Sequence, residues 1–112
     1  AICPNVGWFK DFNDPQAMLD AVFNGKNIIP QNNSNWTQLN VPAINTAMDK
    51  AALVPAGPAR NEAWGKIDDM VTQQAPGIPY LWDKIPTVES SNVRGVVNQN
   101  STSWDLDFTS LK

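Results

Sequence analysis

The stretch NVGWFKDFNDP, residues 5–15, decides the fold that the sequence predicts. It begins as a short apolar run and then places an acid, Asp11, three residues after Trp8. It ends in Asp14-Pro15, a helix-start signal, because Asp accepts a hydrogen bond from a free amide of the first turn and Pro has no N–H to satisfy. The predicted order is strand, polar corner, helix. Side chains at such a corner of an open α/β sheet face a ligand-binding crevice.

The spacing of apolar residues predicts the other elements of a mixed α/β chain. Asn24-Gly25 is expected to end the first helix in a left-handed conformation, and Asn40 to cap the second helix. A Pro/Gly break at 55–58 predicts that the second and third helices pack as an antiparallel hairpin over Met48, Trp64 and Met70. The expected helices are 15–23, 41–53 and 59–75, the long polar loop is 26–40, and the expected strands or extended pieces are 2–9, 78–82, 88–90, 93–98 and 103–108.

Composition excludes several classes of function. A net charge of −3 and a pI near 4.6 argue against a nucleic-acid partner, which needs a basic surface. The chain has no His, so it lacks the commonest general base and metal ligand, and we expect neither enzyme activity nor a cofactor. Asp11, Asn13 and Asp14 resemble the start of a calcium loop, but its Gly and terminal Glu are missing. The single Cys3 is either free and buried or paired with a cysteine upstream.

Five segments together point to a family. The pattern Gly7-Trp8-x-x-Asp11-aromatic-x-Asp14-Pro15 with a helix after it resembles the extracellular peptide-binding proteins of bacterial ABC importers, a solute-binding family that includes oligopeptide-, dipeptide- and nickel-binding proteins. The resemblance covers nearly all of the chain. Its other segments are the Asn-rich loop 32–35, the helix at 44–51, the helix at 59–75 with the APGIPYLW run at 75–82, and VRG at 93–95.

The resemblance implies a C-terminal fragment of a two-lobe periplasmic-binding-protein type II fold, with the order strand, helix, loop, helix hairpin, strands. Residues 1–77 would belong to the second lobe, and residues 78–112 would be a crossing segment with strands that return to the first lobe. The implied function is capture of extracellular peptides by lobe closure. The implied partners are a peptide, the membrane permease and the missing N-terminal part of the same protein. The implied location is extracellular or periplasmic, with a lipoprotein anchor.

The resemblance also assigns site residues. It makes Asp11 the counter-ion of the ligand's α-ammonium group and Trp8 a wall of the same pocket, and Trp36 is the loop residue that we expect to line the cleft. On the residues alone, Asp11 is instead a solvated turn acid or a partner of Lys10, and Trp8 is a core residue. Many members carry a small residue and Ala where Phe9-Lys10 stand here, so Lys10 either neutralises Asp11 or binds a ligand carboxylate.

Two features leave the ligand open. The family also binds nickel chelates, haem and oligosaccharides, so the resemblance by itself does not fix the ligand class. Five Trp and many Asn also fit a small secreted carbohydrate-binding or interaction module, which is the alternative function. Sequons at Asn32, Asn35 and Asn100 are attributed to the Asn-rich composition, because the family resemblance is bacterial.

Overall fold

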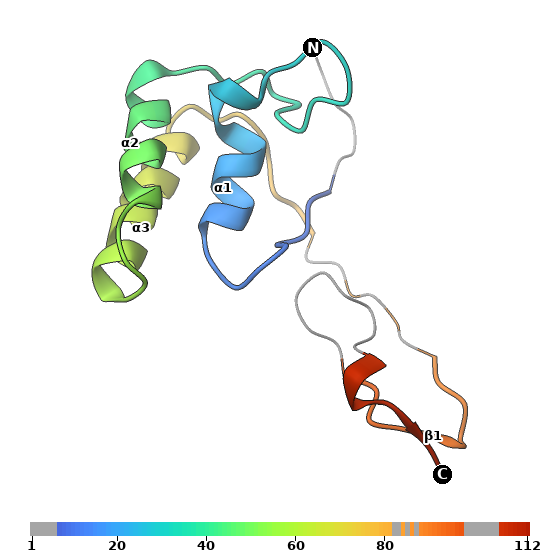
Figure 1. Cartoon of the computed structure of the whole chain (residues 1–112). Coiled ribbons are helices and arrows are strands. Elements are labelled where there is room, and N and C mark those ends of the chain that lie inside the picture. Colours follow the sequence, from blue (N-terminus) through green and yellow to red (C-terminus); the bar gives the residue numbers. More distant parts are fainter. Residues whose placement is uncertain (1–6, 82–83, 85, 87, 98–105) are drawn as a thin grey trace.

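The computed structural model describes residues 7–81, 84, 86, 88–97 and 106–112 of the chain. Within these residues the protein is a mix of helices and one small antiparallel sheet, which is compatible with the predicted α/β class (Figure 1). No helix of the described part is long and apolar enough to cross a membrane. The elements are α1 (Gln16–Phe23), the 3₁₀ helix η1 (Gly25–Asn27), α2 (Pro42–Ala52), α3 (Pro58–Thr72), β1 (Val93–Arg94), the 3₁₀ helix η2 (Leu106–Phe108) and β2 (Ser110–Leu111).

The three α-helices share one hydrophobic core. Helices α2 and α3 run antiparallel side by side, and α1 lies against both of them (Figure 1). Met48 and Trp64 are fully buried, and Met70 packs against them half-buried, as the sequence predicted. The core residues recur every three or four positions, which places them on one face of each helix. They are Leu19 of α1, Ile44, Met48 and Ala51 of α2, and Trp64, Ile67 and Val71 of α3.

The start of α2 and the end of α3 differ from the prediction. The first residue of α2 is Pro42, so the capping position falls on Val41, and Asn40 lies one residue too early to cap the helix. Its side-chain oxygen instead accepts a hydrogen bond from Asn45 Nδ2 at 2.9 Å. Helix α3 ends at Thr72, three residues before the predicted end, and Ala75 already has a φ of 47° in the left-handed region.

The backbone conformation at the end of α1 also differs from the prediction. Asn24 is extended, with φ −75° and ψ 124°, rather than left-handed. Gly25 follows, and a Cβ there would lie 2.2 Å from Asn40 Oδ1 and 2.7 Å from Asn45 Nδ2, so a larger residue would have to displace these two side chains. Its N–H donates to Asn45 Oδ1 at 2.9 Å. Helix α1 therefore ends without a left-handed cap, and the chain that follows it is bonded to α2 through Asn45.

The C-terminal sheet is much smaller than predicted. Strand β1 pairs with β2 in the antiparallel register Val93–Leu111 and Arg94–Ser110. Gly95 follows with a φ of 73°, in the left-handed region that favours glycine. Neither strand contacts α1, α2 or α3, and Figure 1 shows the pair lying apart from these three helices.

Three of the predicted strands are wrong wherever the structure describes them. Residues 7–9 and 78–81 belong to no strand, and 106–108 form η2 with Leu106 and Phe108 exposed. Residues 88–90, predicted as a short extended piece, also belong to no strand. A strand needs a neighbour for its backbone groups and a core for its apolar face. None of these segments finds such a neighbour in the described part of the chain. The remainder of these predicted segments lies outside the described residues, as do Cys3 and Trp82. Residue 98, the last of the predicted extended piece 93–98, and the sequon at Asn100 also lie outside them.

Candidate ligand-binding site

Two of the predicted site residues come together at the corner that precedes α1. The rings of Trp8 and Trp36 meet edge to face, with centroids 6.0 Å apart and an angle of 65° between their planes. The indole N–H of Trp8 donates to the carbonyl of Ala17 at 2.9 Å, so the segment before the corner is tied to α1. Both rings are half-buried. Trp8 therefore has a packing role and still presents part of its ring at the surface.

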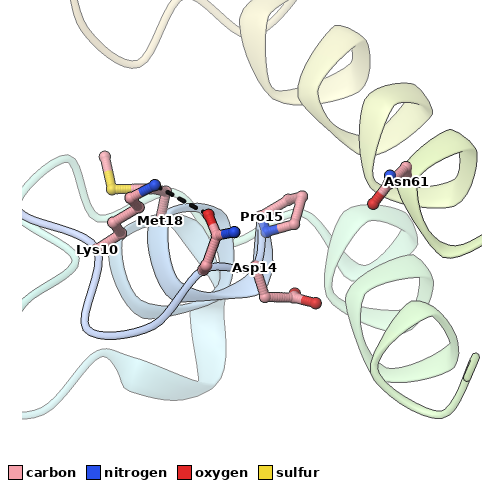
Figure 2. A pocket seen from close by; sticks show the side chains of 6 residues that line it. Lys10, Asp14, Pro15, Met18 and Asn61 are labelled. Carbon is pink, nitrogen blue, oxygen red and sulfur yellow. Dashed lines mark hydrogen bonds between the residues drawn. The ribbon is translucent and has the colours of Figure 1, made fainter. Parts of the chain in front are cut away.

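Asp11 lies at the exposed tip of the same corner. Among the described contacts, its carboxylate has neither a hydrogen bond nor an ion pair. Lys10 does not neutralise it, because the Lys10 ammonium donates to Asn13 Oδ1 at 3.0 Å (Figure 2). The structure thus leaves the Asp11 carboxylate available to solvent or to a ligand.

Asp14 anchors the other end of the corner. Its carboxylate accepts from Arg60 Nε at 2.6 Å and from Arg60 Nη2 at 3.0 Å, a two-point pair, and it also accepts from the backbone N–H of Gln16 at 2.9 Å. The Arg60 hydrogen bond holds the pKa of Asp14 below its ordinary value, while burial opposes this shift. The same hydrogen bond raises the pKa of Arg60. Asp14 is therefore the predicted helix-start residue and, in addition, an ion-pair partner of α3.

Arg60 joins the ends of all three helices, and the sequence analysis missed it. Its Nη1 donates to the carbonyls of Ala51, Ala52 and Val54 at 2.9, 3.0 and 2.9 Å, so it caps the C-terminal end of α2, where a cation is favourable. Its guanidinium carbon lies 5.9 Å from the centre of the Trp64 ring. A signal was present, because Arg60 stands four residues before Trp64 and thus on the apolar stripe of α3.

Asn35 organises the polar loop that carries Trp36. It is fully buried, and its Nδ2 donates to the carbonyls of Asn24 and Leu39 at 3.1 and 2.8 Å. Its Oδ1 accepts from the N–H of Leu39 and the hydroxyl of Thr37, both at 3.1 Å. Both N–H donors and both acceptor positions of this side-chain amide are therefore used by hydrogen bonds within the protein. Asn35 is therefore neither a cleft residue nor an accessible glycosylation site, and it fixes the position of Trp36 beside it.

Other side chains of the loop cap the end of α1. Asn27 Nδ2 donates to the Asp20 carbonyl at 2.6 Å, and the Ser34 hydroxyl donates to the Ala21 carbonyl at 2.8 Å. These carbonyls lie in the second half of α1, where the helix runs out of its own donors, and the Asp20 carbonyl also accepts from the N–H of Asn24 at 3.2 Å. The long loop is held against this helix end by its own polar side chains.

Two depressions mark the surface near these residues. The first has a volume of about 400 Å³ and lies between the corner, α1 and the first turn of α3 (Figure 2). The second is an apolar groove of about 350 Å³ between α2 and α3. Trp8, Asp11 and Trp36 line neither of them. The first depression is lined by Lys10, Asn13, Asp14, Pro15, Met18 and Asn61, and the groove by Ala47, Lys50, Ala51, Val54, Ala63, Lys66, Ile67 and Met70.

Comparison of the chain with protein-family models, with curated proteins and with solved structures finds no match in any of the three. The residues that the structure describes contain no group of three His, Cys, Asp or Glu side chains that could hold a metal ion. The chemistry that the corner offers is ion pairing by Asp11 and Lys10, hydrogen bonding by amides, and contact with two indole rings.

Proposed function

We propose that this chain is part of a solute-binding protein that captures peptides outside the cell for an ABC importer, with Asp11 binding the α-ammonium group of the peptide. The sequence resemblance across nearly all of the chain motivates the proposal. The observation that carries it is the exposed Asp11 carboxylate, which has no partner among the described residues and stands on a corner anchored on both sides.

The two anchors support a binding role because they reduce the conformational entropy that the Asp11 corner would lose on binding a ligand. Trp8 is tied to α1 through the Ala17 carbonyl, and Asp14 is tied to α3 through Arg60. Asp11 lies between these two fixed points, three residues from each. A preorganised acceptor loses less conformational freedom on binding, and an ammonium–carboxylate hydrogen bond is among the strong ones.

The two indoles support a peptide more than a sugar. A sugar stacks on the open face of a ring, whereas Trp8 and Trp36 are half-buried and packed edge to face. The Trp8 N–H, which a sugar hydroxyl would need, is already bound to a backbone carbonyl. Trp64 is fully buried in the core. Within the described residues, the carbohydrate-binding alternative therefore has less support than capture of peptides.

The C-terminal part supports the two-lobe component of the proposal. Ile78 and Leu81 are 89% and 69% exposed, and Leu106 and Phe108 are 72% and 58% exposed. Large apolar side chains exposed to this extent are available to pack on another body. We infer that residues 78–112 cross to and pack on the first lobe, in the part of the protein that precedes this chain, while residues 1–77 belong to the second lobe. An exported, lipid-anchored protein that delivers its ligand to a membrane permease completes the proposal.

Calorimetry on the full-length protein tests the role of Asp11. Asp11→Asn is expected to weaken binding of a short free peptide by about 30-fold or more, which corresponds to about 2 kcal/mol for losing one partner of a charge pair that the proposed lobe closure desolvates. Asp69→Asn, the same change at an exposed position of α3, is the control and should bind like the wild type. Unchanged affinity of Asp11→Asn would contradict the assignment. The 112-residue chain by itself holds part of the cleft and should bind peptide weakly or not at all.

A further inference from the structure

The depression beside Asp11 is lined by a positive charge, the Lys10 ammonium, that pairs with no acid among the described residues. Lys10 is exposed, and its only partner among the described residues is the neutral amide oxygen of Asn13, at 3.0 Å. An ammonium has three donors, so two remain for other acceptors. Lys10 directly precedes Asp11 in the same exposed corner.

The acid in the wall of the depression does not cancel this charge. Asp14 lines the same depression, but both of its carboxylate oxygens are paired with the guanidinium of Arg60. Taken together, Lys10, Asp14 and Arg60 contribute a net charge of +1. Without Arg60 the charges of Lys10 and Asp14 would offset each other, and the depression would be electrically neutral.

The other walls fit a short aliphatic acid. Met18 and Pro15 of the α1 start give an apolar surface, and Asn61 closes the opposite side from α3 (Figure 2). The volume of about 400 Å³ is ample for one side chain. A glutamate side chain has methylenes that pack on Met18 and a carboxylate that an ammonium and an amide can bind.

We propose that the depression lined by Lys10, Asn13, Met18 and Asn61 is a subsite for the carboxylate side chain of an acidic residue near the N-terminus of a bound peptide. This inference rests on the proposed function, because Asp11 must hold the peptide N-terminus for an early side chain to reach Lys10. It gives the protein a preference for acidic peptides that the family resemblance does not imply.

The test compares peptides that differ only in charge. Free peptides with Glu or Gln at the first or second position are titrated into the full-length wild type, Lys10→Met and Lys10→Arg. Because the site is open to solvent, the wild type should prefer Glu over Gln by about three- to fivefold at low salt, and less at high salt. Lys10→Met should lose the preference and Lys10→Arg should keep it. Lys50→Met, which removes a charge on α2 outside this depression, should also keep it.

The outcomes separate the two proposals. Free peptides that bind through Asp11 with equal affinity for Glu and Gln would overturn the subsite and leave the proposed function standing. A preference for Glu that persists in Lys10→Met would overturn it equally. Failure of any peptide to bind, or binding that does not depend on Asp11, would overturn the proposed function and the subsite with it. Circular dichroism of Lys10→Met checks that the variant is folded.

Discussion

Replacing Asn35 with Asp should make the stability of the protein strongly dependent on pH. The two side chains have nearly the same shape, so no cavity is created. The Nδ2 of Asn35 donates to the carbonyls of Asn24 and Leu39 at 3.1 and 2.8 Å, and the new oxygen would face both of them. A protonated Asp can donate to one carbonyl and loses the other bond, at about 1 kcal/mol. An ionised Asp can donate to neither carbonyl.

The sign and size of the effect follow from burial. Asn35 is fully buried, so an Asp there is desolvated and faces two carbonyl oxygens, which raises its folded pKa above the unfolded value of about 3.9. The variant is therefore closest to the wild type below pH 4, and it loses about 1.4 kcal/mol per pH unit as the pH rises from the unfolded to the folded pKa. A folded pKa about three units above the unfolded pKa corresponds to a loss of about 4 kcal/mol in the free energy of unfolding. This loss is a large part of the stability of a small domain.

Urea unfolding at pH 4 and pH 7, followed by circular dichroism and tryptophan fluorescence, measures this difference. Asn32→Asp is the matched control, because Asn32 lies in the same loop and is exposed, with a φ of 57° that Asp also tolerates. The pH dependence of Asn35→Asp should exceed that of Asn32→Asp by several kcal/mol. Equal pH dependence of the two variants would refute the role given to Asn35.

Three further changes test the anchors of the corner and the C-terminal sheet. Asp14→Asn should lower the free energy of unfolding at pH 7 by about 1–3 kcal/mol, the usual scale for a hydrogen bond to a charged group. Because Arg60 lowers the folded pKa of Asp14, this contribution is complete above the unfolded pKa and is lost as the pH falls through the folded pKa. In urea unfolding at pH 3, the difference in free energy of unfolding between the wild type and Asp14→Asn should therefore be smaller than at pH 7. A difference that stays constant would contradict the pairing. Trp8→Phe removes the N–H bond to α1 and should cost about 1 kcal/mol, with loss of the near-ultraviolet signal of the indole pair, and an unchanged spectrum would refute the contact. Gly95→Ala places a Cβ 2.0 Å from the Phe108 carbonyl, so it should remove hydrogen-exchange protection from β1 and β2 and leave that of the helices unchanged; intact protection of the strands would count against the geometry.

The helices could be predicted from the sequence because their burial is periodic. Ile44, Met48 and Trp64 stand on stripes that only a helix places on one face, and proline at 42 and 58 marks both starts to within one residue. The strands could not be predicted in the same way. The alternation of residues 103–108 favours a strand only where a sheet and a core receive it, and the described residues 106–108 find neither.

The sequence analysis named Trp8, Asp11 and Trp36 as site residues but predicted none of the contacts that these side chains make within the protein. Trp8 and Trp36 stood out as separate aromatics, but nothing in their spacing of 28 positions indicated that they meet. Arg60 and Asn35 were missed because a polar group is buried only where tertiary partners satisfy it, and those partners come from other elements. The position of Arg60 on the apolar stripe of α3 was the available signal, whereas nothing distinguished Asn35 from its polar neighbours.

A fluorescence titration of the full-length protein with one short peptide, free and N-acetylated, tests the central claim most directly. Acetylation removes the α-ammonium charge and leaves the rest of the peptide unchanged. Trp8 and Trp36 near Asp11 supply the signal. The account predicts that the free peptide binds and that the acetylated peptide binds at least about 30-fold more weakly, by the same loss of one charge partner. Equal binding of the two peptides would contradict an ammonium-binding role for Asp11.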